Sequence, residues 1–357
     1  MEYHTRTHAR TEFKKMRTVH FKPDLCAVTN SRDPIELKNS IVLVEGNSEY
    51  LIGDDAKDYG GSGQRLIGGS IQDKHYQRYI QALLAKGLGP GDHTISIGLS
   101  AAANYIDEFR TDKSSNVLNQ EDHKLLAGLV AEIRFRSGRT DAPIQLCRVK
   151  LKPEDVPVLY ETEAVRNVIP NTAMTFGIFQ IGGGDWQSLL VVDGEIKRDT
   201  HARVAGIRHC ISRMKEQFGL QPDTAEKAWH TETAPSWGKN LYASEWESCV
   251  DAKKEIVQSY VATYFPELVN KFQGYQDRIK AIVLSGGAVH DATFVDALIA
   301  EMPSRYSIYT IDQFQIMEPD GSKLMDPSFT CAFGIHSTGV NVGLDIGNAY
   351  LKGVFDV

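Results

Sequence analysis

The sequence has no stretch that approaches the roughly 20 consecutive apolar residues of a membrane-spanning helix. Its N-terminal segment, MEYHTRTHARTEFKKMR, is polar and has none of the apolar core that a secretory signal needs. These two absences predict a protein that makes no direct contact with a membrane. We therefore expect a cytoplasmic location.

Cysteine is also scarce. The chain has 5 cysteines, an odd number without C-x-x-C spacing, which argues against a disulfide framework and against a zinc site. Its 11 histidines lack the H-E-x-x-H spacing of zinc-binding helices, so we interpret His201, His209 and His230 as surface or helix residues. The cysteine usage fits a reducing cytoplasm.

Positive charge is not in excess. Lys and Arg total 39 against 46 Asp and Glu, which gives a formal net charge of −7. A chain of this charge has no general affinity for nucleic acid or for anionic membranes. The basic stretch from Arg6 to Lys22 is interpreted as a solvated edge, with a local DNA contact as the alternative. We therefore expect any link to DNA to need a separate adaptor protein.

The chain does contain enough apolar material for a large core. It has 357 residues, of which 42% are hydrophobic and 9% aromatic, and this size favours two domains over one. Segments with strand patterns alternate with segments of helical period. This alternation places the fold in the α/β class.

Local patterns predict where the elements lie. Hairpins are expected at residues 41–53 and 175–196, and a helix is expected from Asp73 with Gly87 as its C-cap. The region from Arg203 to about Phe265 is expected to be mostly helical. Further segments with strand or helix patterns are 93–100, 143–151, 279–302, 326–335 and 340–357.

Three predicted strands end in turns of small residues, namely QIGGGD at 180–185, SGGA at 285–288 and DIGNA at 345–349. Where a Cβ is absent, backbone N–H groups can converge on an anion such as phosphate. A single glycine turn is more often an ordinary hairpin feature. Three of them in one α/β chain favour a phosphate-binding protein.

The C-terminal turn combines three kinds of group. Asp345 ends the apolar run Val340–Leu344, Gly347 permits close approach of the backbone, and Lys352 follows on the return strand. A carboxylate that holds hydrated magnesium, a turn of N–H groups and a lysine would together bind a nucleoside triphosphate. The alternative is a plain hairpin with a surface lysine.

The motif LDIGNAYLKG resembles the first phosphate motif of the actin, Hsp70 and sugar-kinase superfamily, QIGGGDWQ resembles the second, and VLSGGAVHDATFVDAL resembles the adenosine motif. The flanking segments SEYLIGDDA, IGLSAAANY and VKLKPEDVPVLYE are similar to those of ParM-type plasmid-segregation actins. The resemblance implies a two-domain, actin-like (ribonuclease-H-like) α/β fold with a nucleotide cleft between the domains.

The order of the motifs is rotated relative to that family, because the first phosphate motif closes the chain instead of opening it. The resemblance therefore implies a circular permutation, in which Arg10–Phe21 is the third strand beside the two strands of the C-terminal motif. The expected domains are residues 1–165 with 307–357, which carry the first phosphate motif, and residues 166–306, which carry the other two motifs.

The resemblance also implies roles for single residues. Asp345 would organise Mg²⁺ through water, and Lys352 would neutralise phosphate charge. Backbone N–H groups for the phosphates would come from two turns, formed by Gly347, Asn348, Ala349 and Tyr350 and by Gly182, Gly183, Gly184 and Asp185. Adenosine would pack against Ser285, Gly286, Gly287 and Ala288.

Glu154 matches the position that orients the attacking water in ParM-type proteins, and it is the expected catalytic residue. Its alternative role is the ordinary chemistry of a helix start, since it directly follows Pro153.

The second phosphate motif departs from the family pattern. Gln180 and Gln187 stand where the family has Asp, and Asp185 and Trp186 replace two Thr positions. An amide in place of a carboxylate removes negative charge from the surroundings of the metal. Hydrolysis is therefore expected to be slow, and nucleotide binding is the firmer expectation.

By this resemblance the chain is identified as a cytomotive ATPase that binds ATP or ADP with Mg²⁺, polymerises with itself and segregates plasmid DNA through an adaptor protein. A superfamily member that does not polymerise, such as a small-molecule kinase or a nucleotide-dependent regulator, is the alternative. A dinucleotide-binding oxidoreductase would need G-x-G-x-x-G between a strand and a helix, and none of the three turns fits that pattern.

Overall fold

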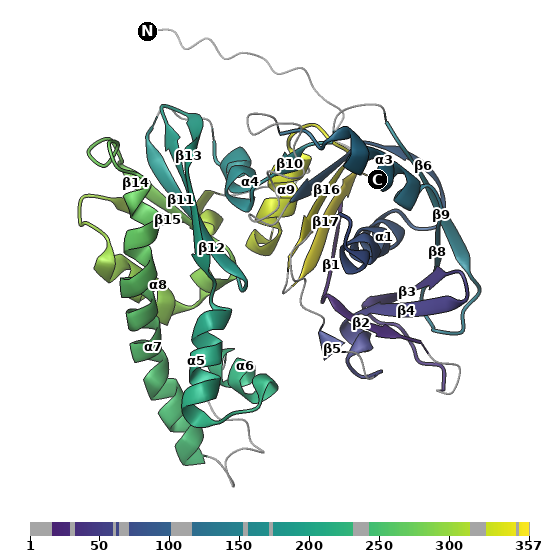
Figure 1. Cartoon of the computed structure of the whole chain (residues 1–357), viewed down its shortest axis with the longest axis horizontal. Coiled ribbons are helices and arrows are strands. Elements are labelled where there is room, and N and C mark those ends of the chain that lie inside the picture. Colours follow the sequence, from purple (N-terminus) through teal and green to yellow (C-terminus); the bar gives the residue numbers. More distant parts are fainter. Residues whose placement is uncertain are drawn as a thin grey trace. The chain divides into compact units, whose positions relative to one another are not determined.

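The computed structural model describes residues 16–28, 33–59, 62–63, 71–100, 116–152, 156–170, 174–230, 243–314, 326–347 and 350–356. It forms two compact units, which we call unit 1 (Met1–Val158 with Gln315–Val357) and unit 2 (Leu159–Phe314). Figure 1 shows the elements of each unit.

Unit 2 contains one five-stranded sheet. Its strands, in chain order, are β11 (Phe176–Ile181), β12 (Asp185–Val192), β13 (Glu195–Ala205), β14 (Ala281–Ser285) and β15 (Ser307–Thr310). The spatial order is β13-β12-β11-β14-β15. Strand β12 is antiparallel to both β11 and β13, whereas β14 is parallel to β11 and β15 is parallel to β14.

The limits of unit 2 differ from the predicted domain boundaries for a physical reason. Helix α4 (Glu161–Val168) packs against β11 and β12, and β15 pairs with β14. Helix α4 buries Ala164 and Val165, and β15 extends the sheet by pairing with β14, so unit 2 includes residues on either side of the segment 166–306 that the sequence suggests.

Unit 1 contains a five-stranded sheet of the same plan. Its strands are β1 (Met16–Phe21), β17 (Leu351–Asp356), β16 (Val342–Ile346), β7 (Ile97–Ser100) and β10 (Val158–Leu159), in that spatial order. Strand β17 is antiparallel to both β1 and β16, and β16 is parallel to β7. The predicted third strand is thus confirmed over Met16–Phe21, while residues 10–15 lie outside the described part of the chain.

The two five-stranded sheets differ in how the chain passes through them. In unit 2 the three antiparallel strands β11, β12 and β13 are consecutive in the chain and adjacent in the sheet. In unit 1 the two strands equivalent to β11 and β12 are β16 and β17, at the C-terminus, and the strand equivalent to β13 is β1, near the N-terminus. One sheet plan is therefore assembled once from contiguous strands and once from both ends of the chain.

Unit 1 also contains a seven-stranded sheet. Its spatial order is β5-β2-β4-β3-β8-β9-β6, with β2 (Asp24–Ala27), β3 (Ser40–Glu45), β4 (Ser48–Gly53), β5 (Ser62–Gly63), β6 (Gly91–Ile95), β8 (Ile133–Arg136) and β9 (Gln145–Leu151). The predicted hairpin at 41–53 is confirmed as β3 and β4, joined at Gly46 with a φ of 59°. Helix α3 (Gln120–Val130) packs against β9.

Helix α1 (Lys74–Leu88) packs against both sheets of unit 1 (Figure 1). It begins where expected, because the Asp73 carboxylate accepts hydrogen bonds from the backbone N–H groups of His75 and Tyr76. The predicted C-cap at Gly87 is wrong, since Gly89, with a φ of 77°, ends the helix. Gly87 lies inside the helix, where the missing side chain leaves room for the Phe355 ring, since a Cβ there would come within 2.2 Å of that ring.

The helices of unit 2 are α5 (Arg208–Phe218), α6 (Pro222–His230), α7 (Ala243–Asn270) and α8 (Ala292–Glu301). The helical region predicted from Arg203 begins later, because β13 continues to Ala205. The core centres on the buried Trp186, whose ring lies 5.8 Å from that of Tyr260 and 5.7 Å from that of Phe294. None of the described helices combines the length and apolar content needed to span a membrane.

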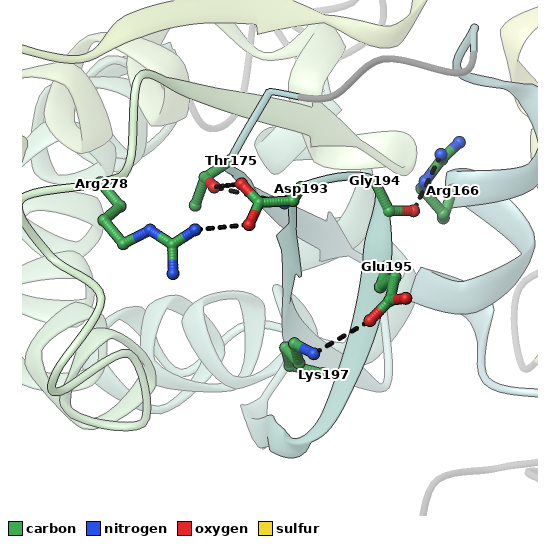
Figure 2. Close-up of polar contacts among 7 residues, drawn as sticks. All are labelled: Arg166, Thr175, Asp193, Gly194, Glu195, Lys197 and Arg278. Atoms are coloured by element: carbon green, nitrogen blue, oxygen red, sulfur yellow. Dashed lines mark hydrogen bonds and ion pairs between the residues drawn. The ribbon is translucent and has the colours of Figure 1, made fainter.

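The turn between β12 and β13 confirms the predicted Asp193-Gly194 hairpin chemistry, with φ values of 54° and 88° at these two residues. Side chains from neighbouring segments hold it, as Figure 2 shows. Arg278 forms an ion pair with the Asp193 carboxylate, the Asp193 N–H donates to Thr175 Oγ1, and Arg166 donates to the Gly194 carbonyl. These contacts tie the loop before β14 to the hairpin.

Helix α9 (Thr330–His336) confirms the helix expected at 326–335 and covers one face of the five-stranded sheet of unit 1. Two glycines permit this close packing. A Cβ on Gly343 would lie 2.2 Å from the Ala332 carbonyl oxygen, and a Cβ on Gly98 would lie 2.6 Å from Ile335. Because side chains alternate along a strand, Asp345 belongs to the same face as Gly343.

Candidate functional site

A row of polar residues crosses the five-stranded sheet of unit 1. Asp345 on β16 pairs in register with Lys352 on β17, and Lys352 pairs in register with His20 on β1. On the other side of Asp345, the Ser100 hydroxyl at the end of β7 donates to Asp345 Oδ1 at 3.0 Å. Residues opposite each other in register share a face of the sheet, so the row Ser100–Asp345–Lys352–His20 lies on one face.

Asp345 is the buried member of this row, with 6% of its surface exposed. Burial raises the pKa of the carboxyl above its ordinary value of 3.8, and Lys352 and the hydrogen bond from Ser100 oppose this effect. The Ser100 hydroxyl also accepts the N–H of Ile346, and Tyr76 donates to the Ser100 carbonyl at 2.9 Å. Ser100 and its partners therefore hold the carboxylate in one orientation.

The turn that follows β16 is tight. The N–H of Gly347 donates to the Tyr350 carbonyl at 3.2 Å, and a Cβ on Gly347 would lie 3.1 Å from that oxygen. Asn348 and Ala349, two of the predicted phosphate-binding residues, lie outside the described residues. Asp345, Gly347, Tyr350 and Lys352 are thus brought together in unit 1.

The glycine turn of unit 2 has a definite orientation. The N–H of Gly182 donates to the Asp185 carbonyl at 2.9 Å, while the carbonyls of Gly182–Gly184 accept N–H groups from Gly206–Arg208, at the start of α5. The N–H of each following residue points opposite to the carbonyl of its peptide group. The N–H groups of Gly183 and Gly184 therefore point away from α5, as an anion site in this turn requires.

The third turn lies beside the second. Ser285 ends β14 and is buried, and Gly286 follows with a φ of 95°. A Cβ on Gly286 would lie 2.3 Å from the Ile181 carbonyl oxygen, whereas the position of a Cβ on Gly287 is open. Because β11 and β14 are parallel, their carboxyl ends meet at one edge of the sheet and bring the two glycine turns together.

Unit 2 carries a row of polar residues that matches the row in unit 1. Gln180 on β11 pairs in register with Ser285 on β14 and with Gln187 on β12, and Gln187 pairs with Arg203 on β13. The sequences at the equivalent strand ends are LDIG at 344–347 and FQIG at 179–182. Gln180 therefore occupies the place in unit 2 that Asp345 occupies in unit 1, and Gln187 the place of Lys352.

The two glutamines have different surroundings. Gln180 is buried, and its Oε1 has no hydrogen-bond partner among the described residues. Gln187 Nε2 lies 3.1 Å from Asp185 Oδ2 and 3.5 Å from Glu161 Oε2, and His201 Nε2 lies 3.3 Å from Gln187 Oε1. Gln187 thus links two carboxylates to a histidine, while the carbonyl oxygen of Gln180 is left as a free acceptor.

Sequence reasoning missed part of this arrangement. His201 is not a helix or surface residue as predicted, because it lies half-buried on β13 with its ring stacked 3.9 Å from that of Tyr160. Ser100 could have been recognised from its resemblance to Ser285, since both end a strand and precede small residues. Glu154, the predicted catalytic residue, lies outside the described residues.

The residues fit a magnesium ion that is held through water. Mg²⁺ prefers oxygen ligands and usually keeps several of its waters. In unit 1 the buried Asp345 carboxylate supplies negative charge, and in unit 2 Gln180 Oε1, which has no partner among the residues that the structure describes, can accept a hydrogen bond from water. An amide at Gln180 gives less negative charge than a carboxylate would, so the fit is better in unit 1.

The two five-stranded sheets, one in each unit, with their polar rows and glycine turns at the strand ends, define an actin-like fold. No family model and no curated protein matches the chain. Among solved structures, it resembles the archaeal actin homolog Ta0583 with a TM-score of 0.60 at 13% identity, over 89% of this chain and 91% of that one. Ta0583 has also been solved in complex with ADP.

Two further similar structures are filaments. The ParM of a 15-stranded filament from Clostridium botulinum matches with a TM-score of 0.57 at 11% identity, over 89% of this chain and 92% of that one. The Alp12 filament matches with a TM-score of 0.54 at 13% identity, over 89% and 88%. The chain therefore has the actin-like fold of ParM-type proteins. Sequence identities this low show a shared fold and nothing finer.

Proposed function

We propose that this protein binds adenine nucleotide with Mg²⁺ and assembles with itself into filaments. The observation that carries the proposal is the row Ser100–Asp345–Lys352, with its buried carboxylate and adjoining lysine, at the end of a strand in an actin-like fold. The ADP complex of Ta0583 and the two filament structures support it.

Each unit carries one proposed phosphate-binding segment. In unit 1, Lys352 would neutralise phosphate charge and Asp345 would hold a hydrated Mg²⁺ through its waters, and the ion would supply further positive charge for the phosphates. In unit 2, the N–H groups of Gly183 and Gly184 donate to phosphate oxygens, and the open surface at Gly287 receives the adenosine.

Hydrolysis is proposed to be slow. Glu154 is the proposed residue for orienting the attacking water. Gln180 can accept a hydrogen bond from a water but cannot take up its proton, because an amide oxygen is a very weak base. Gln187 is already bonded to Asp185 and His201. Unit 2 thus supplies positioning groups and no general base at these two places.

We also propose that the chain is a circular permutation of the actin-like order. The shared sheet plan of the two units supports this, since β16, β17 and β1 match β11, β12 and β13 in order and direction. The C-terminal strand is ordered to Asp356, whose carboxylate contacts His336 at 2.8 Å and Asn341 at 3.0 Å. These contacts tie β17 to helix α9 and to the residue before β16.

Sedimentation tests the proposal. The purified protein is centrifuged with ATP and Mg²⁺, with ADP and Mg²⁺, and with ATP and EDTA, and nucleotide binding is measured in parallel by calorimetry. We expect pelleting that depends on Mg²⁺ and ATP, together with binding that Lys352→Ala weakens.

The outcomes separate the proposed function from its alternatives. Binding without pelleting at any protein concentration would favour a non-polymerising kinase or regulator. No binding of any nucleotide would refute the proposal as a whole. A role in plasmid segregation, through a separate DNA-binding adaptor, predicts that filaments recruit DNA only when the adaptor is added.

A further inference from the structure

The polar row of unit 1 has a fourth member that comes from the opposite end of the chain. His20 is the partner in register of Lys352, which is in turn the partner of Asp345. Directly opposed residues of antiparallel strands have Cβ atoms about 4.5–5.5 Å apart and share one face of the sheet. The imidazole therefore lies next to the proposed phosphate-binding lysine, on its far side from the carboxylate.

The backbone at His20 is held firmly although β1 is an edge strand. Asn39 Nδ2 donates to the His20 carbonyl at 3.1 Å and to Asp54 Oδ2 at 2.8 Å. Asp54 Oδ1 in turn accepts the N–H of Lys22 at 2.8 Å. The strand is thus fixed by β17 on one side and by Asn39 on the other, so the Cα of His20 has a defined place beside Lys352 before any ligand binds.

The ring of His20 lies edge-on to two aromatic neighbours. Its centroid is 5.7 Å from that of the buried Phe329 and 6.3 Å from that of Tyr350. Tyr350 closes the phosphate turn, since its carbonyl accepts the N–H of Gly347. His20 therefore borders both Lys352 and the turn.

Core packing does not require a histidine at position 20. The core residues of β1 are Val19 and Phe21, whereas His20 is exposed, and neither ring nitrogen is in a hydrogen bond with a described residue. The matching row of unit 2 also ends on an exposed basic residue, Arg203. In both rows the basic side chain lies on the strand next to the hairpin, which is β16–β17 in unit 1 and β11–β12 in unit 2.

We propose that His20 binds the nucleotide by donating an imidazole N–H to a phosphate oxygen beside Lys352. The inference rests on the proposed function and adds a phosphate ligand from the N-terminal strand. A neutral imidazole has one N–H to donate and an imidazolium has two, so the contact forms in either protonation state. Because phosphate oxygens are charged, this hydrogen bond is of the stronger, charge-assisted kind.

The test compares His20 with Thr18, which is exposed on the same face of the same strand but pairs with Val354 instead of Lys352. Binding of Mg²⁺-ATP, of inorganic tripolyphosphate with Mg²⁺ and of adenosine is measured by calorimetry for the full chain. We expect His20→Ala to weaken ATP and tripolyphosphate about five- to tenfold and to leave adenosine unchanged. Thr18→Ala should match the wild type, and His20→Arg should restore most of the lost affinity.

Three results would overturn the inference. The first is wild-type affinity for ATP and tripolyphosphate in His20→Ala while Lys352→Ala loses affinity, which would leave the proposed function intact. The second is an equal loss for all three ligands, or a loss that His20→Arg does not restore, which would mean a structural role. The third is unchanged binding in Lys352→Ala, in which case the proposed function fails together with the inference.

Discussion

Replacing Asp345 by Asn should make the nucleotide-free protein more stable and its complex with Mg²⁺-nucleotide weaker. The carboxylate is 6% exposed, and its burial raises its pKa more than Lys352 and Ser100 lower it. A raised pKa means that folding disfavours the charged form. Asn removes the charge, keeps the shape, and can still accept the hydrogen bond from Ser100 through its own Oδ1.

The size of the effect follows from these surroundings. Removing an incompletely compensated buried charge should stabilise the fold by about 1–2 kcal/mol, the usual size of a single-substitution effect. Lys352 loses a partner, but it is only half-buried and remains hydrated, so its cost is small. For a folding unit of about 200 residues, each kcal/mol raises the Tm by about 2–4 °C.

The stability cost of the buried Asp345 charge depends on pH in a definite direction. Below the unfolded pKa, for which the ordinary value is 3.8, the carboxyl is protonated in both states and contributes no penalty. The penalty develops as pH rises from there through the higher folded pKa, and it is complete above that pKa. The difference in Tm between Asp345→Asn and the wild type should therefore be larger at pH 8 than at pH 5.

Thermal melts without nucleotide measure the change in Tm, and calorimetry measures the change in affinity for Mg²⁺-nucleotide. The affinity for ATP should fall about 10- to 100-fold in the presence of Mg²⁺ and change little in EDTA, because the carboxylate acts through the waters of the metal. Ser100→Ala is a matched control, since it removes the hydrogen bond and keeps the charge. A variant Asp345→Asn that melts below the wild type at pH 8, or that binds Mg²⁺-ATP as tightly, would refute the reasoning.

Three further predictions concern other parts of the chain. Gly286→Ala should destabilise the protein by about 2 kcal/mol or more in urea unfolding, because the new Cβ would clash with the Ile181 carbonyl and the backbone φ is positive. The control Gly128→Ala, at an exposed position inside α3, should stabilise the protein by about 0.5–1 kcal/mol. Glu154→Ala should slow phosphate release and leave the Kd for ATP unchanged; equal rates would return this residue to a helix-start role. A thiol reagent should titrate Cys26 quickly in the native protein and the other four cysteines only after unfolding, because those four are buried.

The local features were predictable because short segments determine them. The Asp193-Gly194 turn, the hairpin at Gly46 and the N-cap at Asp73 depend on the backbone preferences and hydrogen bonds of a few neighbouring residues. The strand ends at Asp345 and Gln180 could likewise be recognised from an apolar run followed by glycine. The resemblance of these motifs to those of a known family implied the actin-like fold.

Other features depended on contacts between distant segments. Gly87 would be an ordinary C-cap by its sequence, but the Phe355 ring packs against it and the helix runs on to Gly89. His201 resembles a surface residue in the sequence, yet Tyr160 and Gln187 enclose it on β13. No local pattern contains this information, because the partners lie far away along the chain.

By itself, the sequence determined the tight turns, the strand ends that carry glycine and the identity of the charged groups beside them. Only the tertiary structure decided which of these groups share a face. Ser100, Asp345, Lys352 and His20 lie on four strands from three regions of the chain, and the register of the strands aligns them in one row. Register is set by how whole strands bury their apolar faces, so the composition of this row could not be read from any one segment.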